Sequence, residues 1–335
     1  SFAPISPLPS FGRRTLLRGA LGLGLATAGA GLLSGCGGSA SAPTKEVTMG
    51  CDQGDEVPRK AFQAMMDGYK GEFVPKINFV DHETFKNNIS NYLQGNPDDV
   101  FTWFAGYRAR FFAENDLVSD LSDVWSGLSG FPESIKNASS TRDGRQILLP
   151  QTYYPWAVFY RPSVWKARGY TEPKTKAEWL ALCEKMQADG LVPLAFANKG
   201  GWESMGTFDM MNLRVNGYDF HVSLMEGKEA WDGEKVKNVF RTWNEFKPFE
   251  QPDANGRTWQ EGAQGLLTEK AGMMTMGMFI GQQFETTPHA DDLDFFIFPE
   301  FDPAVGADVV EAPIDGFLMA SRPRNKEGAQ DIRRY

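Results

Sequence analysis

Short apolar runs alternate with amphipathic segments from residue 45 onward. Apolar residues form strand-like runs at 45–52, 76–81 and 99–104, and they recur with helical spacing at 58–69 and 83–93. Strands that alternate with helices in this way favour βαβ units and a mainly parallel sheet. The first part of the chain therefore predicts an α/β lobe.

An aromatic-rich extended run at 147–160 interrupts this alternation and is suited to carry the chain into a second lobe. The next helix has a clear start signal, because Thr175 and Glu178 have the spacing of a capping box. Apolar residues then follow with helical spacing from Trp179 to Met186. Later apolar runs predict strands at 194–197, 272–276, 293–298 and 309–320, and helices at 204–216 and 258–267.

The part of the chain before residue 45 follows another pattern. Arg13, Arg14 and Arg18 precede an apolar, glycine-rich run at 19–33. A cationic segment followed by a short apolar one is typical of a secretory signal peptide, and a membrane span needs about 20 mostly apolar residues. The arginine pair also looks like a twin-arginine export signal. We therefore expect residues 1–35 to be a signal peptide.

A cysteine stands directly after this leader. The run Leu33-Ser34-Gly35-Cys36 resembles the lipobox of bacterial lipoproteins. The resemblance implies that Cys36 is lipidated, that the preceding peptide is removed, and that the lipid anchors the protein to the cell membrane. Residues 36–44 contain no large side chain, so they predict a flexible tether.

The composition narrows the class of partner. The 335-residue chain has 34 Lys and Arg against 43 Asp and Glu, which gives a net charge of −9. A phosphate backbone needs a basic face, so a nucleic-acid partner is disfavoured. The length suffices for two α/β lobes. Cys51 and Cys183 are expected to be buried free thiols, because Cys183 falls on the apolar stripe of a predicted helix.

The sequence lacks the common catalytic and metal-binding motifs. His82, His221 and His289 are scattered without the spacing of a metal site, and there is no nucleophile elbow and no phosphate loop. We therefore expect no cofactor, no metal and no catalytic residue. A glycosidase needs only two carboxylates, so an exported carbohydrate-active enzyme remains an alternative.

Several segments follow one another in an order that is more specific than any one of them: the lipobox at 33–36 and the runs at 99–106, 117–121, 153–161, 270–277 and 313–317. In this order and spacing the chain resembles an extracellular solute-binding protein of a carbohydrate-uptake ABC transporter, in the class that includes maltose-binding proteins.

This resemblance implies an α/β, two-lobed fold of the periplasmic-binding-protein type II class, with a hinge and an interlobe cleft. It divides the chain into a first lobe at 45–152, a second lobe at 153–308 and a return to the first lobe at 309–335. Family members continue with C-terminal helices, so the chain is expected to be a fragment that lacks its C-terminal part.

The resemblance also implies a function and partners. A sugar or oligosaccharide is captured in the cleft and delivered to the permease subunits of the ABC importer. The protein is expected to be an exported monomer, anchored through Cys36 to the extracellular or periplasmic face of the membrane. A binding subunit for a polyamine or a peptide remains the first alternative, because such a site also uses aromatic and acidic residues.

Four aromatic residues are candidate ligand contacts, because the C–H faces of a pyranose pack on aromatic rings. Trp103 ends a predicted strand where the cleft is expected. Tyr154 and Trp156 lie in the extended run that joins the lobes, and Trp202 follows a glycine-rich loop. For the first three, packing in the core or the hinge remains the alternative.

Four polar or glycine positions complete the predicted site. Asp52 follows the first strand, and Asp315 and Gly316 lie in the extended return segment. Gly277 follows a buried strand, where backbone amides can approach a ligand. Carboxylates and backbone groups at strand ends would pair with sugar hydroxyls. A solvated turn is the alternative for Asp52.

Overall fold

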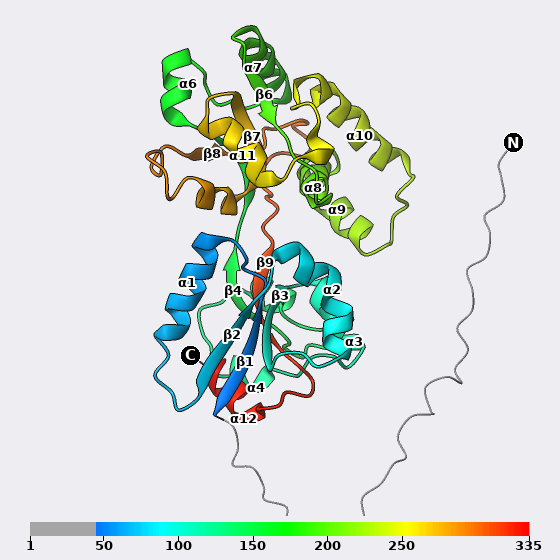
Figure 1. The fold of residues 1–335 in the computed structure, drawn as a ribbon. Helices are drawn as coiled ribbons and strands as arrows, with labels where there is room; N and C mark the ends of the chain where they lie inside the picture. The colour runs from blue at the N-terminus through cyan, green and yellow to red at the C-terminus, as the bar shows by residue number, and fades with distance from the viewer. Residues whose placement is uncertain (1–44, 335) are drawn as a thin grey trace, which may run out of the picture. The chain divides into compact units, whose positions relative to one another are not determined.

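The computed structural model describes residues 45–334, which form an α/β fold with two sheets (Figure 1). The first sheet has the strand order β2-β1-β3-β9-β4 and the second has the order β6-β7-β5-β8. The strands are β1 (Glu46–Cys51), β2 (Val74–Phe79), β3 (Val100–Phe104), β4 (Leu149–Tyr153), β5 (Trp156–Tyr160), β6 (Val192–Ala195), β7 (Ala271–Gly277), β8 (Asp294–Phe296) and β9 (Ile314–Met319).

Helices cover both sheets. Those beside the first sheet are α1 (Glu56–Asp67), α2 (His82–Gln94), α3 (Tyr107–Glu114), α4 (Ser122–Trp125), α5 (Glu133–Ala138) and α12 (Lys326–Ile332). Those beside the second are α6 (Pro162–Arg168), α7 (Lys176–Ala188), α8 (Trp202–Asn216), α9 (Tyr218–Met225), α10 (Glu234–Phe246) and α11 (Trp259–Leu267), with the short 3-10 helices η1 (Lys247–Phe249), η2 (Ala254–Gly256) and η3 (Met278–Gln283).

The strand directions differ in part from the sequence prediction. β1 pairs in parallel with β2 and β3, as the alternation of strands and helices predicts. β9 runs antiparallel to both β3 and β4, and only β6 and β7 are parallel in the second sheet. The mainly parallel sheet predicted for the first lobe is therefore confirmed for β1, β2, β3 and β4, which run in one direction, and β9 is the exception. The physical reason is that β9 enters the first sheet from the second lobe, in the direction opposite to its neighbours.

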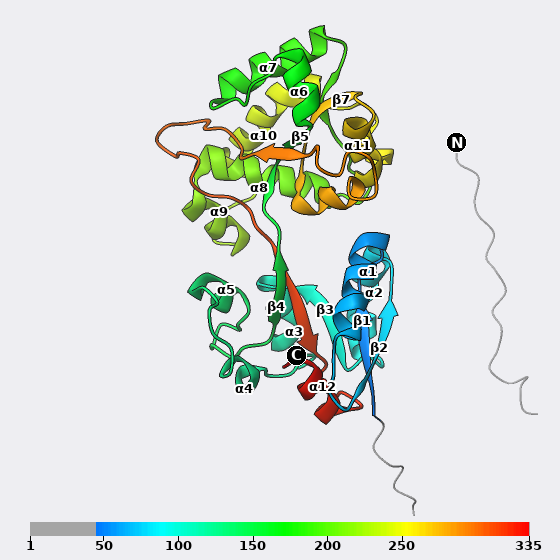
Figure 2. The same ribbon diagram turned by 90° about the vertical axis from the view of Figure 1, so that its left-hand side faces the viewer.

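Two chain segments connect the sheets, and they pair with each other (Figure 2). The outgoing segment leaves β4 at Tyr153 and enters β5 at Trp156. The returning segment precedes β9. The Tyr154 N–H donates to the Pro313 carbonyl at 3.2 Å, and the Trp156 N–H donates to the Glu311 carbonyl at 2.8 Å. The two segments therefore form a short antiparallel pair between the lobes.

The first lobe has apolar clusters on the two faces of its sheet. Phe62 and Met66 of α1 pack with Val47 and Met49 of β1 on one face. On the other face, helices α2 and α3 cover the buried side chain of Phe101 and its neighbours. Burial of one such side chain contributes about 1.5–3 kcal/mol, so these faces stabilise the lobe and fix the strand ends that carry the site.

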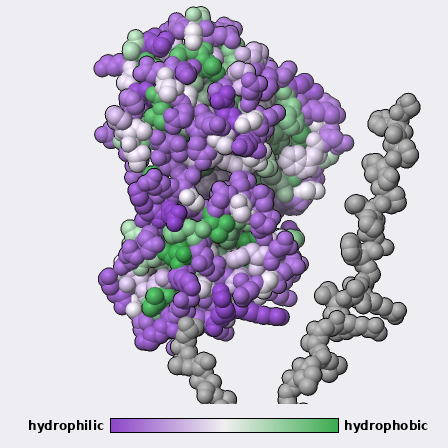
Figure 3. Space-filling model, viewed as in Figure 1, coloured by the Kyte–Doolittle hydropathy of each residue, from purple (hydrophilic) through white to green (hydrophobic). Residues whose placement is uncertain are grey.

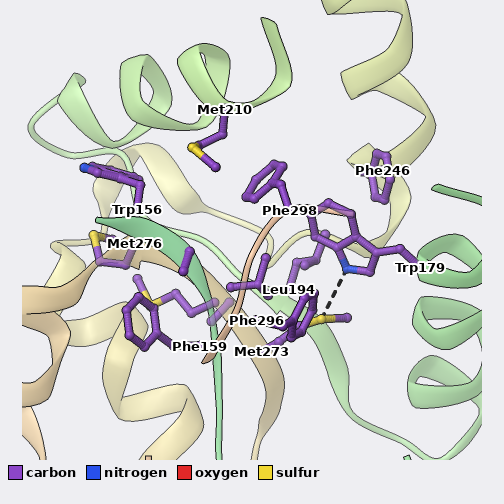
Figure 4. Packing of buried hydrophobic residues seen from close by; sticks show 14 of the residues in the cluster. Trp156, Phe159, Trp179, Leu194, Met210, Phe246, Met273, Met276, Phe296 and Phe298 are labelled. Atoms are coloured by element: carbon purple, nitrogen blue, oxygen red, sulfur yellow. Dashed lines mark hydrogen bonds between the residues drawn. The ribbon is translucent and has the colours of Figure 1, made fainter. Parts of the chain in front are cut away.

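Aromatic side chains dominate the core of the second lobe (Figure 4). Trp179 of α7 lies 4.7 Å from Phe246 and 4.9 Å from Phe298, measured between ring centroids. Its indole Nε1 lies 3.3 Å from the sulfur of Met273 in β7. Trp179 and Met186 are buried together, which confirms the predicted apolar stripe of this helix.

The predicted capping box is only half formed. The Thr175 hydroxyl accepts from the Glu178 N–H, as predicted. The Glu178 carboxylate, however, accepts from the Lys174 N–H at 2.6 Å and does not return to the cap residue. A complete capping box occurs instead at Thr258 and Glu261, at the start of α11.

Cys51 and Cys183 are buried and free, as predicted, and burial raises the pKa of both thiols to about 12. In the face shown in Figure 3, polar residues cover most of the surface and apolar ones form separate patches. Among residues 45–334, no helix is long and apolar enough to cross a membrane. The predicted leader, the lipobox at Cys36 and the tether lie outside the described residues.

Candidate ligand-binding site

Asp52 is the centre of a polar cluster at the carboxyl ends of β1 and β3. Its side chain is 5% exposed. One carboxylate oxygen lies 3.1 Å from Nδ1 of His82 at the start of α2. The other accepts a hydrogen bond of 2.6 Å from the Thr102 hydroxyl in β3. Parallel strands end at the same edge of a sheet, which explains why residues so far apart in sequence meet here.

The partners of Asp52 decide its ionisation. Burial by itself disfavours the charged carboxylate. The hydrogen bond and charge of His82, together with the Thr102 hydroxyl, outweigh burial and hold the pKa of Asp52 below its ordinary value. In return, Asp52 outweighs the burial of His82 and raises the pKa of the imidazole. The pair therefore stabilises the ionised form of each member.

Asp315 is a second carboxyl group beside this cluster, at the start of β9 and paired in register with Phe104 of β3. Its Oδ1 accepts a long hydrogen bond of 3.4 Å from the Tyr154 hydroxyl. Burial, and next the charge of Asp52, raise the pKa of Asp315 to about 7. Burial also raises the pKa of Tyr154. The two carboxyl groups of the site therefore have opposite pKa shifts.

The second lobe contributes a wall of aromatic rings. We use "aromatic wall" for the half-buried rings of Tyr154, Trp202, Trp259 and Phe279. Phe279 is its centre, with ring centroids 5.4 Å from Tyr154, 5.9 Å from Trp202 and 5.2 Å from Trp259. Trp156 supports the wall, because it packs against Trp202 at 6.2 Å. Edge contacts of this kind fix ring orientation.

Contacts between the lobes bring the aromatic wall and the carboxyl groups together. Tyr154 joins the two groups, because it contacts both Asp315 and Phe279. The Lys86 ammonium of α2 lies 5.9 Å from the Trp202 ring centroid. The Gln260 amide of α11 donates to the Asp55 carboxylate at 3.2 Å. Charged groups from one lobe and rings from the other therefore lie side by side.

Four of the predicted site residues come together in this arrangement: Asp52, Tyr154, Trp202 and Asp315. The setting of Trp202 differs from the expectation. It is the first residue of α8, not part of an open loop, and it is half-buried against Trp156 and Phe279. Its contacts with both rings are T-shaped edge contacts.

Two of the predicted aromatic contacts lie buried in the cores of their lobes. Trp103 is 3% exposed and packs in the first lobe against Phe85 and Phe112, at centroid distances of 6.3 and 5.6 Å. Trp156 is 4% exposed and belongs to the core of the second lobe. Both rings are covered because each belongs to a strand whose faces carry helices, so neither offers a face to a ligand.

Packing accounts for the two predicted glycines. A Cβ on Gly316 would lie 2.2 Å from the Leu149 carbonyl oxygen, because β9 passes close to β4 there. A Cβ on Gly277 would lie 2.4 Å from the Phe279 ring. Only glycine fits at such distances. A ligand contact through either backbone stays a prediction.

The sequence prediction missed His82, Phe279 and Trp259. His82 directly follows a strand and begins a helix, which is a position at the expected cleft edge, but a lone histidine more often serves packing. Phe279 comes two residues after Gly277, at the end of a buried strand. The sequence signal that could have identified His82 and Phe279 was their position just after the end of a strand. Trp259 begins α11 and had no such signal.

A hollow with a volume of about 910 Å³ lies elsewhere. Aromatic side chains of Phe196, Phe240 and Trp243 line it beside the loop at 250–256. Neither Asp52, Asp315 nor any ring of the aromatic wall lines this hollow, so we place the candidate site at the two carboxyl groups and the aromatic wall. Within residues 45–334, no cluster of three His, Cys, Asp or Glu side chains could hold a metal ion.

Two α/β lobes, joined by paired crossing segments with polar and aromatic groups between them, define a two-lobed binding protein. The chain belongs to the family of bacterial extracellular solute-binding proteins, whose model matches residues 54–332. This confirms the family and the fold class that the sequence predicts. Membership in an extracellular family indicates an exported protein.

Named relatives agree with this family. An uncharacterised ABC transporter extracellular-binding protein of Pyrococcus horikoshii is 22% identical over 71% of this chain and 54% of its own length. A probable sugar-binding periplasmic protein of Mesorhizobium japonicum is 23% identical over 67% of this chain and 54% of its own. The chain thus spans about half the length of the curated relatives it matches.

Solved structures share the fold. The bacterial solute receptor AcbH is 43% identical, with a TM-score of 0.84 over 87% of this chain and 75% of that chain. AcbH is described as having an exclusive preference for β-D-galactopyranose. A chitin oligosaccharide binding protein, 21% identical over 86% of this chain and 76% of that one, has a TM-score of 0.75 and supports the fold alone.

Proposed function

We propose that the protein is the sugar-binding subunit of an ABC importer, which captures its ligand between the lobes and delivers it to the membrane permease. The observation that carries this proposal is the meeting of Asp52 and Asp315 with the aromatic wall. The likeness to relatives that are named sugar-binding proteins supports it.

The chemistry of a sugar matches both halves of this arrangement. The C–H faces of a pyranose pack on aromatic rings, and Trp and Tyr offer large areas at little cost in side-chain entropy. Sugar hydroxyls donate to carboxylates in charge-assisted hydrogen bonds. Two carboxyl groups at the site disfavour an anionic sugar, so a neutral sugar is the better ligand.

A galactose-like monosaccharide is the first candidate ligand. AcbH, at 43% identity, is described as preferring β-D-galactopyranose. The aromatic wall consists of closely packed rings and not of an extended row, which suits one sugar ring more than a long chain. We propose Asp52, His82, Tyr154, Trp202, Phe279 and Asp315 as the residues that surround it.

The remaining features of the proposal concern location. We propose that the segment before residue 36 directs export, that Cys36 carries a lipid, and that residues 36–44 tether the binding lobes near the permease. A tether raises the effective concentration of the binding protein at its partner. We further propose that the protein acts as a monomer, without catalysis, with lobes at 45–152 plus 309–335 and at 153–308.

Isothermal titration with a ligand panel tests the function. The panel contains D-galactose, D-glucose, D-xylose, raffinose, putrescine and a tripeptide. Binding of a sugar that is lost in Asp52→Ala supports the proposal. Binding of putrescine or the tripeptide with no sugar bound would overturn it. Release of monosaccharide from raffinose by the purified protein would overturn the absence of catalysis.

A further inference from the structure

The two carboxyl groups of the site face different partners. Asp52 has two donors within hydrogen-bond distance, the His82 imidazole at 3.1 Å and the Thr102 hydroxyl at 2.6 Å. Such donors stabilise a carboxylate and hold it charged. Asp52 therefore offers only acceptor oxygens to a ligand.

Asp315 has no comparable partner. Its carboxyl group accepts the long hydrogen bond from Tyr154, at 3.4 Å. Within residues 45–334 no cation forms an ion pair with it. Burial and the neighbouring Asp52 charge raise the pKa of Asp315 to about 7, so near neutral pH about half of the molecules carry a proton on this carboxyl group.

Four charged or titratable groups act on Asp315, whereas the facing residue of β4 is the uncharged Thr152. Asp52 follows β1, His82 begins α2, Arg108 belongs to α3 and Tyr154 lies in the crossing segment. The Arg108 guanidinium stacks 4.2 Å from the Phe104 ring centroid and 5.2 Å from that of Trp103. His82 is already paired with Asp52. Both cations lower the pKa of Asp315, but burial and the Asp52 charge outweigh them, so the Asp315 charge stays poorly compensated.

We propose that Asp315 meets the bound sugar as a neutral carboxylic acid that donates a hydrogen bond, whereas Asp52 meets it as a carboxylate that accepts. This inference rests on the proposed sugar-binding function. A pyranose ring oxygen can only accept, so a carboxylate cannot pair with it. A protonated Asp315 offers a donor beside those of Tyr154 and His82, and ligand closure that removes water favours its neutral form further.

The first test is the pH dependence of sugar affinity. If only protonated Asp315 binds, the competent fraction is about 0.9 at pH 6 and about 0.03 at pH 8.5, so the affinity for D-galactose, or for the panel sugar that binds, falls about 30-fold between them. Titration at pH 7 in buffers of different ionisation enthalpy should show uptake of about half a proton per sugar. A flat affinity profile and no proton uptake would overturn the proposal.

The second test replaces each carboxyl group by an amide. Asn keeps a donor and an acceptor, so Asp315→Asn should bind at pH 7 within about threefold of the unchanged protein and lose the pH dependence. Asp315→Leu, whose side chain has neither a donor nor an acceptor, should lose at least tenfold in sugar affinity. Asp52→Asn should also lose at least tenfold, because it exchanges an acceptor for a donor beside His82.

Asp209→Asn is the matched control. Burial also raises the pKa of Asp209 to about 7, but this residue lies on α8 near Glu311 and outside the site. Its replacement should leave the 30-fold pH dependence of sugar affinity unchanged. Loss of the profile in Asp209→Asn and its persistence in Asp315→Asn would overturn the proposal. If no sugar of the panel binds at any pH, the proposed function fails and this inference fails with it.

Discussion

The two lobes contribute unlike parts to the proposed site. The first lobe presents ionisable groups, where Asp52 and His82 shift each other's pKa and both act on the pKa of Asp315. The second lobe presents the aromatic wall centred on Phe279. One lobe therefore offers directional hydrogen bonds and the other offers apolar area.

This difference suggests why capture needs both lobes. Carboxyl groups in an open site compete with water for sugar hydroxyls, and their net gain is small. Rings covered by a ligand lose water without such competition. A ligand that touches both lobes binds the closed arrangement better than the open one, and this differential affinity drives closure. Variants that remove the contribution of one lobe at a time test this difference between the lobes.

The largest expected effect follows Asp52→Ala. The change removes an acceptor from the site and leaves the His82 imidazole and the Thr102 hydroxyl without their buried partner. We expect affinity for the sugar to fall about 100-fold, or about 3 kcal/mol, by calorimetric titration. The exposed Asp232 provides the control, since Asp232→Ala removes an acid that lies outside the site. An equal loss of sugar affinity in Asp52→Ala and Asp232→Ala would contradict the placement of Asp52 in the binding site.

A smaller effect, on stability, is expected from Asp209→Asn. The folded state raises the pKa of Asp209 from 3.8 to about 7, so protonation stabilises the fold below about pH 4 and this contribution is lost as the pH rises to 7. The amide avoids that loss. We expect a gain of about 2 kcal/mol at pH 8, after allowance for local relaxation, and none at pH 4.

Urea unfolding at the two pH values measures this effect. The exposed Asp219 on the neighbouring helix α9 gives a control variant, Asp219→Asn, which should change stability little at either pH. A gain of the same size at pH 4 would show that Asp209 acts through packing and not through its charge. The result bears on the comparison, because Asp209 is an acid of the aromatic lobe that serves no ligand contact.

Trp202→Ala tests the aromatic lobe. The ring packs on Phe279 and Trp156, and its free face is proposed to carry the sugar. We expect a loss of about tenfold in affinity, or about 1.4 kcal/mol, which is less than for Asp52→Ala. Trp231→Ala is the control, since Trp231 is 54% exposed on the same lobe and outside the wall. An unchanged Kd in Trp202→Ala would remove this ring from the site.

The sequence predicted the elements of both lobes better than it predicted the site. Apolar periodicity located the strands and helices, because burial of one face imposes a period on the chain. It could not indicate the direction of β9, since alternating residues are the same in parallel and antiparallel strands. Trp103 lies near the end of a strand and Trp202 begins a helix, yet only neighbours from distant segments determine that the first is buried.

The prediction of polar residues was limited in the same way, because the sequence does not show which residues become their neighbours in the fold. Asp52 was predicted because it follows a strand, and Asp315 was predicted because it lies in the extended return segment. Their opposite pKa shifts were not, because these depend on His82 from α2 and on Tyr154 from the crossing segment. Phe279 was missed for a similar reason, since nothing in its local sequence indicates that three other rings meet there.

The smallest expected effect concerns contacts that join the lobes without touching the proposed site. Gln260 donates to Asp55 at 3.2 Å, and the Tyr107 hydroxyl donates to Glu226 at 3.1 Å. Both contacts are exposed, so each stabilises the closed arrangement by about 0.5 kcal/mol. Gln260→Ala or Tyr107→Phe should therefore weaken binding about twofold.

Gln260→Ala and Tyr107→Phe should differ from changes in the aromatic wall or at the carboxyl groups in how the loss of affinity varies among sugars. A shift in the closing equilibrium alters the competent fraction of the protein and not the contacts of the ligand. Gln260→Ala should therefore weaken every sugar of the panel by the same factor, whereas Trp202→Ala should weaken them unequally, according to the ring face that each presents. Gln63→Ala, at an exposed position of α1, should leave the affinity for every sugar unchanged. Sugar-dependent losses in Gln260→Ala would mean that this residue contacts the ligand, and the division between closing contacts and binding contacts would have to be redrawn.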